Sequence, residues 1–125
     1  MGLITTRLAI AGDEGTRVVA ALFDTGASAS FVCRDIVESV ATVLRLPAAE
    51  VYTLSDGVGR LRAAETAVLH VRIRGIRLSD DFLVVERLAD QMIIGANTMQ
   101  KWQVTLDVEN EELCIDRRVG RMLLA

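Results

Sequence analysis

The feature that most constrains this chain is an aspartate placed where an apolar run stops. The apolar stretch 20–23 ends in Asp24-Thr25-Gly26, and the chain becomes apolar again at Phe31 after four small residues. Moving a carboxylate out of water is costly unless hydrogen bonds or charges compensate it. An aspartate at the end of a buried strand, followed by Gly in a tight turn, is therefore a poor choice for stability alone. We infer that Asp24 has a chemical task.

Length and composition fit a single domain that spans residues 1–125. The chain is 51% apolar and 25% charged, which is ordinary for a globular protein. A domain of this size buries about two-thirds of its unfolded surface, so it folds without metal or disulfides. No apolar run reaches the ~18 residues of a membrane span, and the N-terminus lacks a signal-peptide pattern. We expect a cytoplasmic location, either as a separate protein or as a domain of a larger one.

The net charge and the few cysteine and histidine residues make several classes of partner unexpected. The net charge is −3 with acids and bases mixed along the sequence, which does not favour nucleic acid. The two cysteines, Cys33 and Cys114, are expected to be free thiols in a reducing compartment. With His70 as the single histidine, a zinc site is not expected, and no metal or other cofactor is predicted.

The hydrophobic pattern predicts a mainly β domain with one longer and one short helix. The longer helix is predicted over 35–46, where apolar residues recur at helical spacing before Pro47. The short helix is predicted over 97–101. Strands separated by Gly-containing turns are predicted elsewhere: 3–10, 16–23, 51–54, 60–74, 82–85, 102–106 and 113–115. This order disfavours a doubly wound parallel sheet.

Three motifs in a fixed order resemble the retropepsin-like aspartic proteases, the single-domain, retroviral-type branch of the pepsin clan. They are an apolar run leading into Asp24-Thr25-Gly26-Ala27, a hairpin with the tip Asp56-Gly57-Val58-Gly59, and Ile93-Ile94-Gly95-x-Asn97 before a short helix. Asp-Thr-Gly alone is a weak signal, since it also suits a simple turn capped by Asp. The resemblance covers residues 16–115 and implies an acid-protease β-barrel with a flap hairpin.

The resemblance also implies a reaction and an oligomeric state. Peptide hydrolysis by water needs a base and an acid, which two carboxylates a few ångströms apart provide because one of them keeps a proton. Aspartic proteases are the type case of this arrangement. The chain has one Asp-Thr-Gly, and Ser55-Asp56-Gly57 has the wrong order. A homodimer that joins Asp24 from each subunit is therefore expected, with a peptide or protein as substrate.

The remaining motif residues take roles by the same resemblance. Thr25 would hydrogen-bond to the partner's loop, Gly26 would let the substrate backbone approach, and Ala27 would line the site. Ile93, Ile94 and Gly95 would pack behind the catalytic loop and line the pocket. Residues 51–63 would form the flap, with Asp56, Gly57, Val58 and Gly59 at its tip, and would close over an extended peptide.

Two departures separate this chain from retroviral enzymes, which usually carry an acid and an Arg that pair near the dimer interface. Ser28 and Ala96 stand at those positions, so the retroviral mode of dimer stabilisation is not expected here. The helix predicted over 35–46 is also longer than its retroviral counterpart. Both traits make the chain more similar to cellular or bacterial members.

Two other functions are compatible with parts of the sequence. One is a non-catalytic dimerisation or peptide-binding module on the same fold, which would bind peptides without turnover. The other is a thiol hydrolase that uses Cys33 or Cys114 with His70. The second is disfavoured because neither cysteine has motif context and His70 falls on the polar, arginine-rich face of the strand predicted over 60–74.

Overall fold

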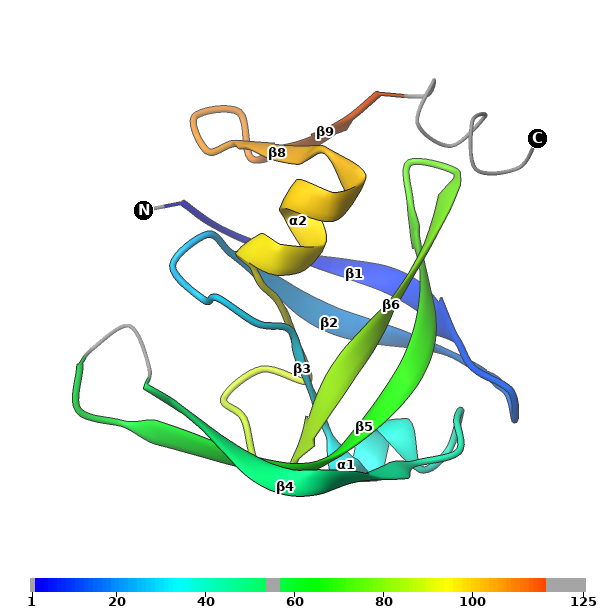
Figure 1. The fold of residues 1–125 in the computed structure, drawn as a ribbon. Helices are drawn as coiled ribbons and strands as arrows, with labels where there is room; N and C mark the ends of the chain where they lie inside the picture. The colour runs from blue at the N-terminus through cyan, green and yellow to red at the C-terminus, as the bar shows by residue number, and fades with distance from the viewer. Residues whose placement is uncertain (1, 54–56, 117–125) are drawn as a thin grey trace.

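The computed structural model describes residues 2–53 and 57–116, and most of its regular structure is β-strand (Figure 1). Within these residues the strands are β1 Leu3–Ala11, β2 Thr16–Asp24, β3 Phe31–Cys33, β4 Leu44–Thr53, β5 Arg60–Ile73, β6 Ile76–Val85, β7 Met92–Ile94, β8 Val104–Asp107 and β9 Glu112–Ile115. The helices are α1 Arg34–Val37 and α2 Ala96–Trp102. The prediction of a mainly β domain is confirmed.

Six strands form a closed barrel. Their order is β1-β2-β7-β3-β6-β5, and β5 returns to β1 through the pairs Ile10–Val71 and Ala11–His70. β4 extends the sheet beyond the barrel by pairing with β5 (Figure 1). β7 lies between β2 and β3, parallel to β2 and antiparallel to β3. Because β2 and β7 run in the same direction, Asp24, the last residue of β2, and Gly95, the residue after β7, lie at one end of the barrel.

The core has two parts. Alternate residues of the strands fill the barrel, and Phe23 and Phe82 are among its largest fully buried side chains. A smaller apolar cluster packs the β4–β5 hairpin against β3 and β6. Its buried members are Ala29, Phe31, Ala63 and Val85, and Tyr52 and Leu61 pack against them from the hairpin. The hairpin is therefore held by apolar contacts as well as by strand pairing.

The prediction of a longer helix over 35–46 is wrong. α1 ends at Val37, and the segment from Leu44 onward belongs to β4. Tertiary contacts determine this conformation, because the Glu14 N–H donates to the Val40 carbonyl at 2.9 Å and the Thr42 N–H donates to Asp13 at 2.7 Å. These bonds fix the segment against the β1–β2 hairpin, and its β-branched residues suit an extended chain.

The β5–β6 hairpin is longer than predicted. β6 begins at Ile76 rather than at Phe82, so the polar residues that precede Phe82 are part of the strand. Arg74 and Gly75 both have positive φ, which fits the tight turn predicted at Gly75. The long hairpin provides two walls of the barrel, and its arginines lie on the outer, exposed side.

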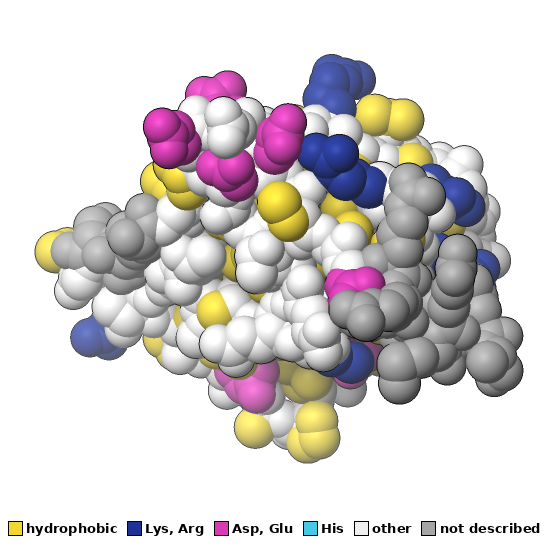
Figure 2. All heavy atoms as spheres, turned by 90° about the horizontal axis from the view of Figure 1, so that it is seen from above, with side chains coloured by type: hydrophobic (Ala, Val, Ile, Leu, Met, Phe, Trp, Pro, Cys, Tyr) yellow, Lys and Arg dark blue, Asp and Glu magenta, His cyan; other side chains and the backbone are white. Residues whose placement is uncertain are grey.

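The short helix and the last hairpin are confirmed, but Trp102, predicted to begin a strand, ends α2, and β8 begins at Val104. α2 covers the predicted segment 97–101, and the Trp102 Nε1–H donates to the Ser79 carbonyl at 3.1 Å. β8 and β9 form a separate two-stranded sheet. Figure 2 views the face that carries this hairpin, where acidic side chains gather at one corner and several basic ones lie beside them along the same edge. Among the described residues, no helix is long and apolar enough to cross a membrane.

Candidate active site

The loop after β2 presents the Asp24 carboxylate at one end of the barrel. Asp24 is the last residue of β2 and is 8% exposed. The Gly26 N–H donates to Asp24 Oδ1 at 2.8 Å, and the Ala27 N–H donates to the Asp24 carbonyl at 3.2 Å. The first bond offsets part of the cost of burying a carboxylate. The turn geometry therefore holds the carboxylate in place and directs it into the adjoining pocket.

Thr25 makes its hydrogen bonds inside the chain. Its Oγ1 accepts from the Gly2 N–H at 2.8 Å and donates to the Gly2 carbonyl at 3.3 Å. The Thr25 N–H also donates to that carbonyl, at 3.1 Å. The predicted bond from Thr25 to a partner's loop would have to use the remaining lone pair or replace Gly2. It stays a prediction.

The segment behind the loop supports it through close backbone contacts. The Ala96 N–H at the start of α2 donates to the Ala27 carbonyl at 2.7 Å. A Cβ on Gly95 would lie 2.2 Å from the Ala29 carbonyl oxygen, far inside the distance that two atoms can share. Glycine at this position is thus required by the close approach of two backbones. Ile94 is buried in the barrel core, whereas Ile93 lines the pocket beside Asp24.

Ser30 is a supporting residue that sequence reasoning missed. It is 1% exposed, and its Oγ accepts from the Gly95 N–H at 2.9 Å. The same hydroxyl lies 2.6 Å from Thr98 Oγ1 and 3.1 Å from Asn97 Oδ1. The Ser30 hydroxyl thus links the loop after β2 to β7 and α2 through hydrogen bonds. Its signal in the sequence is a polar residue directly before the buried β3.

A pocket adjoins the carboxylate, and two of its walls are aromatic. Its lining includes Asp24, Ala27, Ser28, Phe31, Tyr52 and Ile93. The catalytic loop, β3, β7 and the β4–β5 hairpin all contribute to it. Phe31 and Tyr52 were not among the predicted site residues. The available signal was that the single tyrosine of the chain lies in the predicted flap.

The β4–β5 hairpin has the position expected of a flap. It extends to the same side of the barrel as the loop between β2 and β3 (Figure 1). The register between β4 and β5 shifts between Arg45 and Glu50, which marks the base of the projecting part. Gly57 has φ of +77°, and Val58 is 84% exposed. Asp56, predicted at the tip, lies outside the described residues.

Cysteine and metal-ligand side chains of the described residues offer little for chemistry. No group of three or more His, Cys, Asp or Glu that could hold a metal ion is found there. Cys33 and Cys114 are free, the first buried and the second exposed. Burial raises the pKa of the Cys33 thiol, which makes it a poor nucleophile. The carboxylate of Asp24 remains the best candidate for chemistry.

Comparison with protein families agrees with this geometry. Residues 11–101 match the family described as "gag-polyprotein putative aspartyl protease". The chain belongs to this retropepsin-like aspartyl protease family. The matched segment begins at the end of β1 and ends in α2, so it includes the Asp24 loop, the β4–β5 hairpin and Gly95. A comparison with curated protein sequences found no match.

Solved structures of two retropepsin-like proteins are similar in fold. The retroviral protease-like domain of Ddi1 from Leishmania major has a TM-score of 0.65 at 20% identity, over 93% of this chain and 90% of that domain. EIAV protease, solved with the inhibitor HBY-793, has a TM-score of 0.61 at 19% identity, over 82% of this chain and 89% of its own. The retropepsin-like fold of this family member is thus shown.

The sequence suggested two traits that separate this chain from retroviral members, and the structure removes one of them. α1 has four residues, so the predicted long helix no longer separates the chain from retroviral members. Ser28 and Ala96 remain as departures. Ser28 is exposed in the catalytic loop, while the backbone of Ala96 holds that loop through Ala27. The predicted closeness to cellular or bacterial members would rest on these two residues alone, and it stays a prediction.

Proposed function

We propose that this family member is an aspartic endopeptidase whose active site contains Asp24 from each of two subunits. The observation that carries the proposal is the placement of Asp24. Its carboxylate is nearly buried, receives the Gly26 N–H on Oδ1 and borders a pocket beneath the β4–β5 hairpin. Within the described residues, no hydrogen bond to Oδ2 is found. That oxygen is available to a water molecule in the pocket.

The proposed reaction follows from the chemistry of paired carboxylates. One carboxylate takes a proton from water, whose oxygen attacks the peptide carbonyl, while the protonated partner donates to the carbonyl oxygen. The resulting tetrahedral intermediate collapses as its C–N bond breaks. The carboxyl group that took the water proton gives it to the leaving nitrogen, and a hydroxyl of the intermediate returns a proton to the other carboxylate. A carboxylic acid and an amine are released. A single carboxylate cannot hold both protonation states at once, so the site needs a second copy of Asp24.

An apolar groove beside the catalytic loop is the surface on which we place the second subunit. It is lined by Gly2, Thr25, Met99, Leu106 and Val108, among others. Val108 is 50% exposed, so the groove offers apolar surface that a partner could cover. The groove adjoins Thr25, the neighbour of Asp24. A partner seated there with two-fold symmetry would bring the two catalytic loops together.

The substrate is proposed to lie extended between the catalytic loop and the flap. Backbone hydrogen bonds to the β4–β5 hairpin would hold it, and its side chains would alternate between the two sides. Closure of the hairpin would exclude water other than the reacting molecule. In this account Ile93 and Ala27 line the cleft, and Gly57, Val58 and Gly59 lie over the peptide.

A peptide-library digest tests the proposal. Asp24→Asn retains the oxygen that accepts the Gly26 N–H but cannot act as an acid–base group. We expect the parent protein to cleave and Asp24→Asn to lose activity at least about a hundredfold. Asp35→Asn, which removes an exposed carboxylate from α1, should cleave like the parent. Peptide binding without cleavage by the parent would instead establish the non-catalytic module.

A further inference from the structure

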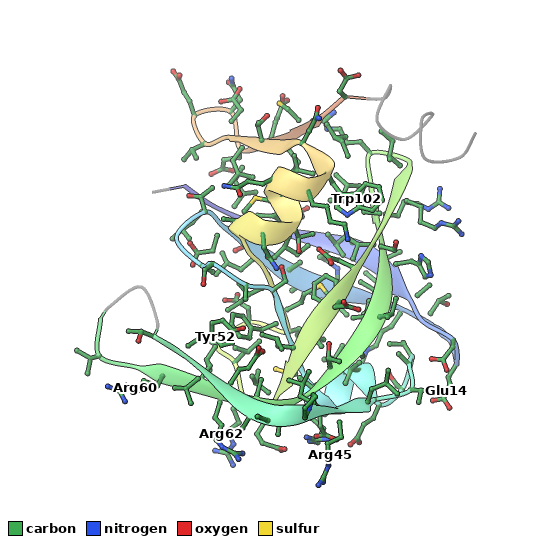
Figure 3. The ribbon with its side chains drawn as sticks, viewed as in Figure 1. Glu14, Arg45, Tyr52, Arg60, Arg62 and Trp102 are labelled. Atoms are coloured by element: carbon green, nitrogen blue, oxygen red, sulfur yellow. The ribbon has the colours of Figure 1, made fainter. Side chains whose placement is uncertain are left out.

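Tyr52 projects from the flap toward the barrel. It pairs with Leu61 across the β4–β5 hairpin, and both side chains pack against the smaller apolar cluster. Figure 3 shows Tyr52 directed into the molecule, while Arg60 and Arg62 of the same hairpin point away. The alternation of β-strand side chains thus places one large aromatic ring on the cleft side of the flap.

The Tyr52 ring contacts the floor of the cleft through Phe31. Their ring centroids are 5.3 Å apart and the planes meet at 81°, which is a favourable edge-to-face geometry. Phe31 is 3% exposed and begins β3 directly after the catalytic loop. Because Phe31 is fixed by the barrel, it provides a rigid surface for the Tyr52 ring. The pair joins the flap to the floor beside Asp24.

Glu50 holds the other end of the Tyr52 side chain. The Tyr52 hydroxyl donates to Glu50 Oε2 at 3.1 Å. Burial of the phenol and this hydrogen bond raise the pKa of Tyr52, so the ring stays neutral. Both residues lie on the same face of β4, two positions apart. Phe31 and Glu50 therefore restrain the ring from two sides, and it acts as a fixed wall.

The pocket bounded by this wall is small. Its cavity volume is about 40 Å³, far below the roughly 300–1,000 Å³ of ligand pockets. Asp24 forms part of its lining, so an acidic side chain entering it would be repelled. A long apolar side chain would meet Tyr52. An extended peptide advances about 3.3 Å per residue, so the entering side chain lies close to the bond that faces Asp24.

We propose that Tyr52 determines substrate specificity by limiting this pocket to small, uncharged side chains. The inference rests on the proposed function and adds the class of peptide that the site selects. Tyr52 acts by occupying space that a larger substrate side chain would need. It takes no part in proton transfer.

Paired variants of the flap test the role of Tyr52. The readout is the ratio of kcat/KM for peptides that differ only by Leu or Ala at the pocket position, which the library digest identifies. Tyr52→Ala should raise the Leu-to-Ala ratio roughly tenfold or more. Tyr52→Phe should retain the parent's ratio because it keeps the ring. Val51→Ala, which changes an exposed side chain on the opposite face of the flap, should also retain it.

Each result decides between defined alternatives. If the parent cleaves and Tyr52→Ala leaves the ratio unchanged at every position, the inference is overturned and the proposed function stands. If the parent does not cleave, the proposed function fails, and the same ratio is then taken from equilibrium binding of the peptides by fluorescence anisotropy. A shift for Tyr52→Ala supports the inference there, and no shift overturns it. Tyr52→Leu, which retains an apolar contact with Phe31, replaces Tyr52→Ala if the latter does not fold.

Discussion

At the scale of single residues, the loop that carries Asp24 depends on polar side chains that never reach the pocket. Ser30 connects the N–H of Gly95 with Thr98 and Asn97, and Ser30 and Thr98 are both buried. Buried polar groups are tolerated only when hydrogen bonds satisfy them. The loop geometry around Asp24 is therefore coupled to the residues that follow β7. This coupling links residues 65 positions apart and has no local sequence pattern.

The first prediction concerns Ser30→Ala. Removing the hydroxyl leaves the buried Gly95 N–H without its acceptor, so the free energy of unfolding should fall by about 1–3 kcal/mol. Urea denaturation measures the change. Ser28→Ala, an exposed serine of the same loop, is the matched control and should stay within about 0.5 kcal/mol of the parent. Equal losses in the two variants would show that the Ser30 network does not support the loop.

At the scale of elements, one arginine braces the base of the β4–β5 hairpin. Arg34 in α1 pairs with Glu65 of β5, with Glu86 after β6 at 2.6 Å, and with Glu38 at 3.7 Å. Glu65 pairs with Arg45 across the sheet, next to the register shift where the projecting hairpin begins. These ion pairs of Arg34, called the brace below, thus hold β5 at the point from which the β4–β5 hairpin projects. Motion of the flap should be confined to the residues beyond this shift.

The second prediction concerns the pH dependence of this brace. Hydrogen bonds from Arg34 lower the pKa of Glu65 below its ordinary value of 4.5. A carboxyl group whose pKa is lowered by folding stabilises the folded state at pH values above its unfolded-state pKa. That contribution is lost as the pH falls through its folded-state pKa. Arg34→Gln should therefore lower Tm at pH 7, and the difference from the parent should shrink below about pH 4.

Arg77→Gln is the control for this experiment. Arg77 is an exposed arginine of β6 for which no ion pair is found within the described residues. It should leave Tm nearly unchanged at both pH values. A Tm difference between Arg34→Gln and the parent that stays constant from pH 7 to pH 3 would contradict the account of the brace.

The elements also show where sequence reasoning works and where it fails. The β1–β2 and β8–β9 hairpins, α2 and the loop at Asp24 follow from local patterns, since each has its turn or capping signal nearby. The helix predicted over 35–46 failed because contacts with Asp13 and Glu14 fix that segment as turns. Tyr52 and Ser30 escaped prediction because their roles depend on partners distant in sequence, such as Phe31 and Gly95.

At the scale of the whole molecule, the barrel presents one carboxylate beside an apolar groove. Two-fold association across that groove would supply the missing acid without a second motif in the chain. The ion pair that the sequence lacks at Ser28 and Ala96 leaves apolar contact as the main contribution to such an interface. Association of this kind should depend weakly on salt.

The third prediction tests this groove. Val108→Glu places a charge in the proposed interface, where its desolvation should weaken the dimer by roughly tenfold or more. The substituted side chain is half exposed in the single chain, so Tm of the monomer should change little. Sedimentation equilibrium measures the dissociation constant. Val18→Glu, at a similarly exposed valine of β2 outside the groove, should dimerise like the parent, and identical behaviour of the two variants would place the interface elsewhere.

The central claim is that each active site contains Asp24 from two chains, and subunit mixing measures this directly. Parent and Asp24→Asn are refolded together at varied ratios and constant total concentration, and the rate of peptide cleavage is recorded. If both carboxylates are needed, the rate falls as the square of the parent fraction, so an equal mixture retains about a quarter of the parent rate. A linear fall, with about half the rate retained in the equal mixture, would show that each subunit acts alone and would contradict the account.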